Sequence, residues 1–250
     1  MAAENATAIV LRAIPFSESS LVVTLYTQEF GKISGLAKGA RRLKGPFESA
    51  LDLLGVCRIV FLRKSSDSLD LLTEAKLVRR FRPAGHDLSG LYAGYYVAEL
   101  LLELTDPYDT HPELFNLADE ALQALSRGES VARHALRFEL GALRVLGHLP
   151  TLEACAECGR SVEPSGRVAF GLLSGGVLCG ACRGGQKQVA SITGAVLQTM
   201  AQLADPNRTA WRRIEITPAI YGQLRGLLNH YVSHLLGKKL RLHEYLHVVG

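Results

Sequence analysis

The sequence predicts an α+β protein of several domains, with an N-terminal strand barrel and a helical C-terminal domain that carries a cysteine-rich insertion. Three observations predict this architecture. Short runs rich in β-branched and aromatic side chains fill the N-terminal third of the 250 residues. Apolar residues then recur at helical spacing. Two CxxC pairs interrupt the helical pattern between residues 153 and 185.

Five candidate strands follow one another in the N-terminal third, at residues 7–14, 21–26, 32–36, 56–62 and 69–78. Polar or glycine-containing turns separate them. An open sheet of this size would leave two edges unpaired, and closing it into a small barrel removes both. We therefore expect a five-stranded OB-fold barrel over residues 1–82.

Helical spacing of apolar side chains predicts helices over residues 91–104, 112–125, 131–146, 193–203 and 218–236. Pro112 stands in the first turn of one of them, where its missing N–H costs little, and Gly147 follows the next as a stop. Little periodicity is present between residues 153 and 185. We expect a helical domain made of residues 83–152 and 186–250, with residues 153–185 inserted as a separate module.

Four of the five cysteines form two CxxC pairs, Cys155 with Cys158 and Cys179 with Cys182, and 20 residues lie between the pairs. Two such turns supply the tetrahedral set of four sulfurs that zinc favours. The alternatives are unrelated buried thiols or a thioredoxin-like redox pair, and the surrounding sequence lacks the βαβ pattern of the latter. Four protein ligands leave no open position, so we expect one structural Zn²⁺ per chain. Cys57 stands alone in a predicted strand and is expected to be a small core residue.

Positive charge is concentrated in residues 1–82, which contain 13 Lys/Arg and 8 Asp/Glu, whereas the remaining residues contain 15 and 16. This asymmetry indicates a polyanionic partner, either nucleic acid or an anionic membrane. No acidic residue lies between Glu29 and Glu48. The basic residues of this run are Lys32, Lys38, Arg41, Arg42 and Lys44.

A basic run can simply be a solvated surface, but on an OB-fold barrel we expect it to contact the phosphates of nucleic acid. Phe30 and Phe47 flank the run. Either ring can stack on a base, although core packing is the use we expect.

Two stretches, FSESSLVVTLYT running into GKISGLAKGARR and GGVLCGAC at residues 175–182, resemble the RecO family of bacterial recombination and repair mediators. The resemblance implies an OB-fold domain, a helical domain and a zinc module. It also implies binding to single- and double-stranded DNA, annealing of complementary strands, and participation in the RecF pathway with RecR and single-stranded-DNA-binding protein. The family's basic DNA-binding stretch falls on Lys38, Arg41, Arg42 and Lys44.

One enzyme motif is present, because His243, Glu244 and His247 match the HExxH pattern of zinc hydrolases. Only three residues follow the motif. We therefore expect a non-enzymatic DNA-binding protein. The alternatives are a scaffold whose zinc module contacts a protein partner, and a zinc hydrolase.

The sequence has no secretory signal pattern and no run of about 20 apolar residues that would span a bilayer. Five cysteines in such a chain favour metal binding or free thiols over disulfides. We expect a cytoplasmic, nucleoid-associated protein that does not enter the membrane.

Overall fold

The computed structural model describes residues 3–42, 45–47, 50–64, 68–85, 87–207 and 209–248. The chain divides into two compact units, Met1–Glu129 and Ser130–Gly250. The domain boundaries expected from the sequence, after residues 82, 152 and 185, stay predictions. Within the described ranges, no helix has the length and apolar character needed to cross a membrane.

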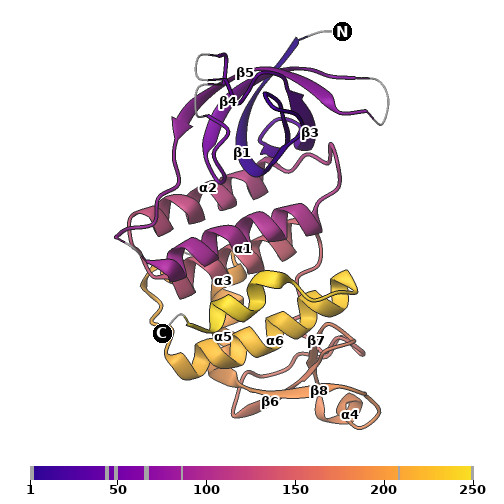
Figure 1. Ribbon diagram of the computed structural model, residues 1–250. Coiled ribbons are helices and arrows are strands. Elements are labelled where there is room, and N and C mark those ends of the chain that lie inside the picture. Colours follow the sequence, from indigo (N-terminus) through magenta and orange to yellow (C-terminus); the bar gives the residue numbers. More distant parts are fainter. Residues whose placement is uncertain are drawn as a thin grey trace. The chain divides into compact units, whose positions relative to one another are not determined.

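Five strands form the sheet of the first unit and confirm the five-stranded prediction (Figure 1). Their bounds are β1 Ala3–Pro15, β2 Leu21–Thr27, β3 Gly31–Ala37, β4 Val56–Leu62 and β5 Asp70–Arg79. The pairing order is β1-β2-β3-β5-β4, and β4 pairs with β1 again, so the sheet closes into a barrel. All pairs are antiparallel except β3 with β5, which are parallel over three residue pairs.

The barrel interior is filled by alternate residues of the strands, as the pleat requires. Val23, Leu25, Ile33 and Phe61 are among its buried side chains. Cys57 belongs to the same cluster and is 0% exposed, which confirms that it is a core residue. Burial raises the pKa of its thiol to about 12.

Two helices, α1 (Leu88–Leu104) and α2 (Pro112–Ser126), pack against each other and against β1 and β2. Figure 1 shows them side by side at one end of the barrel. Asp87 caps α1, because its carboxylate accepts hydrogen bonds from the Ser89 and Gly90 N–H groups. Both helices were predicted from the sequence, and α1 begins three residues earlier than predicted.

The second unit contains the helices α3 (Val131–Val145), α5 (Gly194–Ala204) and α6 (Pro218–Leu236), which confirm the helical C-terminal region. Arg225 on α6 and Glu139 on α3 form an ion pair that is 1% and 0% exposed. A three-stranded sheet of order β7-β6-β8 accompanies the helices. Its strands are β6 Arg167–Gly171, β7 Gly176–Leu178 and β8 Val189–Thr193, and the four-residue helix α4 is Gly180–Arg183. The 3₁₀ helices are η1 (Ala210–Arg213) and η2 (Arg241–Val248).

Candidate nucleic-acid interface and metal cluster

The part of the basic run from Lys38 to Arg42 follows the end of β3 and lies against the loop that joins β1 to β2. We call it the basic segment. Lys38, Arg41 and Arg42 are exposed. The Arg41 main-chain N–H donates to the Ser19 carbonyl at 3.0 Å, and its Nη1 donates to the Ser17 carbonyl at 3.3 Å. The segment is therefore fastened to the neighbouring loop while its cationic side chains face solvent. Lys44 lies outside the described residues.

Lys32 has a different environment from the other basic residues of the run. Its Nζ donates to the Leu102 carbonyl at 2.7 Å and also to the Thr105 carbonyl, at the C-terminus of α1. Burial lowers the pKa of this ammonium, against the opposing effect of the nearby carboxylates of Asp106 and Glu103. Lys32 thus donates hydrogen bonds to carbonyls that have no partner within the helix at the end of α1. A contact of this ammonium with DNA, as predicted from the sequence, would compete with these hydrogen bonds.

The aromatic residues beside the basic segment are divided between core and surface. Phe47 is 2% exposed, and Phe30 packs edge-on against Phe61 with ring centroids 5.4 Å apart. Phe47 therefore lies in the core and the half-buried Phe30 packs against it, in agreement with the expected packing role. The exposed ring is Phe16, in the β1–β2 loop, which is 65% exposed and was not singled out from the sequence. Its position after Pro15 and before a Ser-Glu-Ser-Ser turn is the signal that could have indicated an exposed loop tip.

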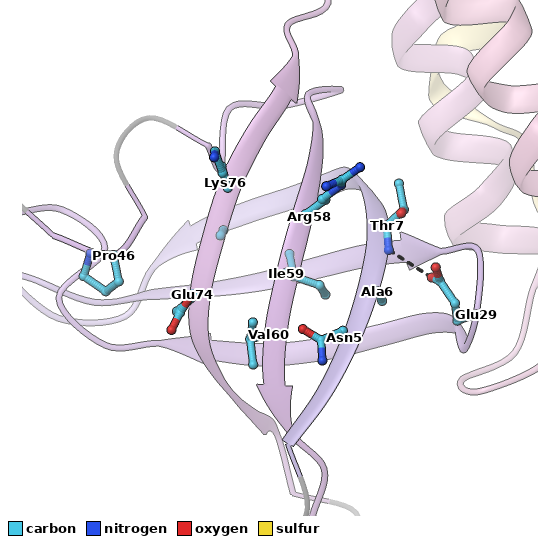
Figure 2. Close-up of a pocket in the computed structure, with 11 residues that line it drawn as sticks. Asn5, Ala6, Thr7, Glu29, Pro46, Arg58, Ile59, Val60, Glu74 and Lys76 are labelled. Carbon is cyan, nitrogen blue, oxygen red and sulfur yellow. Dashed lines mark hydrogen bonds between the residues drawn. The ribbon is translucent and has the colours of Figure 1, made fainter.

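A separate hollow of about 340 Å³ lies on the outer face of β1, β4 and β5. Figure 2 shows Arg58 and Lys76 on its adjacent strands, where they are register partners. Glu74 and Glu29 line the same hollow, and Glu29 accepts a 2.9 Å hydrogen bond from the Thr7 N–H. The two cations and two carboxylates balance each other, so this face is less suited to a polyanion than the basic segment.

The four predicted metal ligands come together in the second unit. The sulfurs of Cys155, Cys158, Cys179 and Cys182 all lie within 4.8 Å of one another. The Cys158 and Cys179 sulfurs are 3.7 Å apart. A tetrahedral site with Zn–S bonds of about 2.3 Å requires sulfur separations of about 3.8 Å. Among the described residues no other group of His, Cys, Asp and Glu side chains is close enough to hold a metal ion.

Short local turns bring each pair of cysteines together. The Gly159 N–H donates to the Cys155 carbonyl at 2.8 Å, with Gly159 at a φ of +72° that a side chain would disfavour. The Cys179 carbonyl accepts from the Cys182 N–H at the start of α4, at 3.1 Å. The hairpin of β6 and β7 carries the second pair and turns through residues 172–175, with Gly175 at a φ of +68°.

The thiols differ in how readily they ionise. Main-chain hydrogen bonds, the largest from Cys179, lower the pKa of Cys155 to about 6, and bonds from Cys182 lower that of Cys179. Hydrogen bonds to the Cys179 and Cys158 sulfurs raise the pKa of Cys182 to about 12. Adjacent thiolates repel one another, and a divalent cation would remove that penalty for all four. The residues therefore fit a metal ion.

The HExxH motif lies in the 3₁₀ helix η2. Three residues complete a turn of such a helix, so positions three apart share a face and positions four apart do not. His243 is 6% exposed. In zinc hydrolases this motif presents its two metal ligands from an α-helix. Here the same residues lie in a 3₁₀ helix.

A basic strand barrel and a helical region with four clustered cysteines define a class of two-part proteins with a candidate metal-binding cluster. Two family descriptions match this chain, "Recombination protein O N terminal" over residues 1–81 and "Recombination protein O C terminal" over residues 85–244. The chain belongs to the RecO family of DNA repair proteins, as the resemblance predicted. Membership gives it a role in DNA repair and recombination.

Several curated relatives cover nearly the whole chain. The DNA repair protein RecO of Rhodopirellula baltica is 45% identical over 262 aligned residues, which cover 96% of this chain and 97% of the relative. The protein of the same name from Myxococcus xanthus is 34% identical and covers 97% of this chain and 96% of its own length. That from Moorella thermoacetica is 30% identical, with 98% and 91% covered.

Proposed function

We propose that this chain is a non-enzymatic mediator of DNA repair and recombination that binds single- and double-stranded DNA and anneals complementary strands. In the same proposal it acts with RecR and single-stranded-DNA-binding protein to help load the recombinase, in the cytoplasm and in association with the nucleoid. Family membership supports this proposal for the chain as a whole. The barrel and its basic segment support it for DNA binding.

We further propose that the barrel is an OB fold. An OB fold is a five-stranded Greek-key barrel that binds oligonucleotides on the face of strands 2 and 3 and with the loops beside it. The cyclic strand order and the parallel pairing of β3 with β5 support this assignment. The basic segment follows β3 directly, at the edge of that face.

The observation that carries the proposal is the fastening of the basic segment to the β1–β2 loop. Because Arg41 is held by main-chain atoms, the exposed cations of the segment keep a defined position on the barrel. Such cations neutralise phosphates without reading bases. Lys38, Arg41, Arg42 and Lys44 are the four proposed contacts. For Lys32, which the sequence also predicted as a contact, we propose a structural role at the end of α1.

The test is the salt dependence of binding to a single-stranded oligomer. Four phosphate contacts predict that log affinity falls against log salt with a slope of about −3. The variant Arg41→Glu with Arg42→Glu should flatten this slope by about 1.4 and weaken binding regardless of sequence. Arg213→Glu with Lys187→Glu changes the net charge equally at exposed positions of the second unit and is the matched control. Equal losses in the two variants would overturn the assignment of the segment.

For the cysteine cluster we propose one structural Zn²⁺ per chain, held by all four thiolates. When bound, the ion supplies folding free energy and no open coordination position for chemistry. We expect one zinc per chain by elemental analysis, and four thiols that become reactive when a chelator removes it. Cys57 is the internal control, because its buried thiol should react only after denaturation. A native protein free of metal, with four reactive thiols, would contradict the proposal.

A further inference from the structure

The β1–β2 loop presents an aromatic ring beside the basic segment. Phe16 is 65% exposed, which is the largest exposed fraction among the big apolar side chains of the described residues. Its N–H donates to the Ser20 carbonyl at 3.0 Å, so the antiparallel ladder continues past the end of β1. Side chains alternate along such a ladder, and Phe16 therefore projects from the same face as Ile14.

That face carries an apolar row across four strands. Ile14 on β1 pairs with Val22 on β2, and Val22 pairs with Leu36 on β3. Leu36 in turn pairs with Leu71 on β5. Ile14 is 39% exposed and the other three are half-buried, although the interior of the barrel is filled by the opposite face of each strand. We call these four side chains the apolar row, and Phe16 follows Ile14 by two residues on the same face.

Charge identifies the kind of molecule that fits this surface. Arg12 projects from the same face one step along, and the exposed Lys38, Arg41 and Arg42 belong to the segment fastened to the Phe16 loop. Glu18 is the acidic residue of that loop. Four cations against one carboxylate favour a polyanion, and a polyanion with flat apolar parts is a nucleic acid whose bases are unpaired.

We propose that Phe16 stacks on an unpaired base of single-stranded DNA, with the apolar row supporting the neighbouring base and the basic segment holding the intervening phosphates. This inference rests on the proposed function and names the side chain that distinguishes single-stranded DNA from duplex DNA. In a duplex the bases are already stacked and paired, so the Phe16 ring finds no free face there. A surface that binds only unpaired bases favours single-stranded DNA over the annealed duplex.

The first experiment compares Phe16→Ala with the native chain on three ligands of equal length: oligo(dT), an abasic oligomer and duplex DNA. Loss of one stacked base should weaken oligo(dT) binding by about 5- to 100-fold. Binding to the abasic oligomer and to the duplex should change by less than about twofold, because their phosphate contacts stay. Leu88→Ala removes a side chain that is 62% exposed at the start of α1, and this control should leave all three affinities unchanged.

Unchanged oligo(dT) affinity in Phe16→Ala would overturn the inference and assign the exposed ring to a protein interface. Equal losses on oligo(dT) and the abasic oligomer would also overturn it, since the ring would then act without a base. If the native chain binds none of the three ligands, the proposed function itself fails. If it binds them with the expected salt slope but does not distinguish oligo(dT) from the abasic oligomer, only the stacking inference fails.

A second variant tests stacking directly. Phe16→Trp retains an aromatic face, so it should keep the affinity for oligo(dT) within about threefold. Base stacking should quench its emission, measured against the native chain, in which Trp211 is 4% exposed and serves as background. Absence of quenching at saturating oligo(dT) would contradict stacking at this position.

Discussion

Replacing Lys32 by Met separates a structural role from a DNA-binding role for one cation of the basic run. The substitution keeps an apolar stem of similar length and removes the ammonium that donates to the Leu102 and Thr105 carbonyls. Hydrogen bonds from charged groups contribute about 1.5–3 kcal/mol each when shielded from water. Because Lys32 is half-buried, water competes for the ammonium, and we expect a combined loss of about 2 kcal/mol.

Urea denaturation of the full chain measures this loss, and hydrogen exchange of the peptide covering residues 98–108 locates it at the C-terminus of α1. We expect faster exchange there and an unchanged salt slope for oligo(dT). Lys38→Met is the matched control, because Lys38 is exposed after the end of the same strand. That variant should retain stability within about 0.5 kcal/mol and lose about 0.7 from the salt slope. If Lys32→Met instead leaves exchange unchanged and lowers the slope, the ammonium contacts phosphate and the helix-end argument is wrong.

Two further predictions concern a buried ion pair and a half-buried tyrosine. Arg225→Met should destabilise the second unit by about 3–5 kcal/mol, because it leaves the buried Glu139 carboxylate without this cation. The double variant with Glu139→Leu should regain most of that loss in urea, and an equal loss in both would contradict the argument. Burial, and next the hydrogen bond to Asp70, raise the pKa of Tyr108 from 10.0 to about 12. The folded chain thus holds the phenol proton more tightly, and this stability is present below pH 10 and lost as pH rises towards 12. Tyr108→Phe should flatten the fall of the urea midpoint in that window, and a parallel fall would refute the assignment.

Elements whose ends are determined by residues close to them in the sequence were predicted well. Helix α6 runs from Pro218 to Leu236 as the sequence indicated. Thr217 caps it by accepting the Ile220 N–H, and Gly237 ends it at a φ of +67°. The strand β4 also matches its predicted bounds, because its β-branched and apolar residues lie between a glycine and charged residues.

Features that depend on distant partners were missed. Strands β6 and β8 have five residues each, and β8 follows a charged, glycine-rich stretch with little apolar pattern of its own. The role of Lys32 depends on carbonyls that are 70 and 73 residues away along the chain. The four cysteines could be grouped from spacing alone, since a CxxC turn is itself local. The turn residues around Phe16 could indicate a loop tip, but they do not say which way its ring points, and the exposure of the ring depends on the fold around it.

The fastening of Arg41 has a consequence for how freely this surface can change in sequence. Its partners are the main-chain carbonyls of Ser17 and Ser19, so the hydrogen bonds do not depend on either hydroxyl. Residues 17 and 19 can therefore be exchanged for many others while the two loops stay joined. A library randomised at these two positions should tolerate wide substitution, whereas proline would be rejected wherever its ring altered the path of the carbonyl. The contact between the two loops thus depends on the main-chain conformation. The side chains at positions 17 and 19 can therefore vary to suit the DNA strand that is bound.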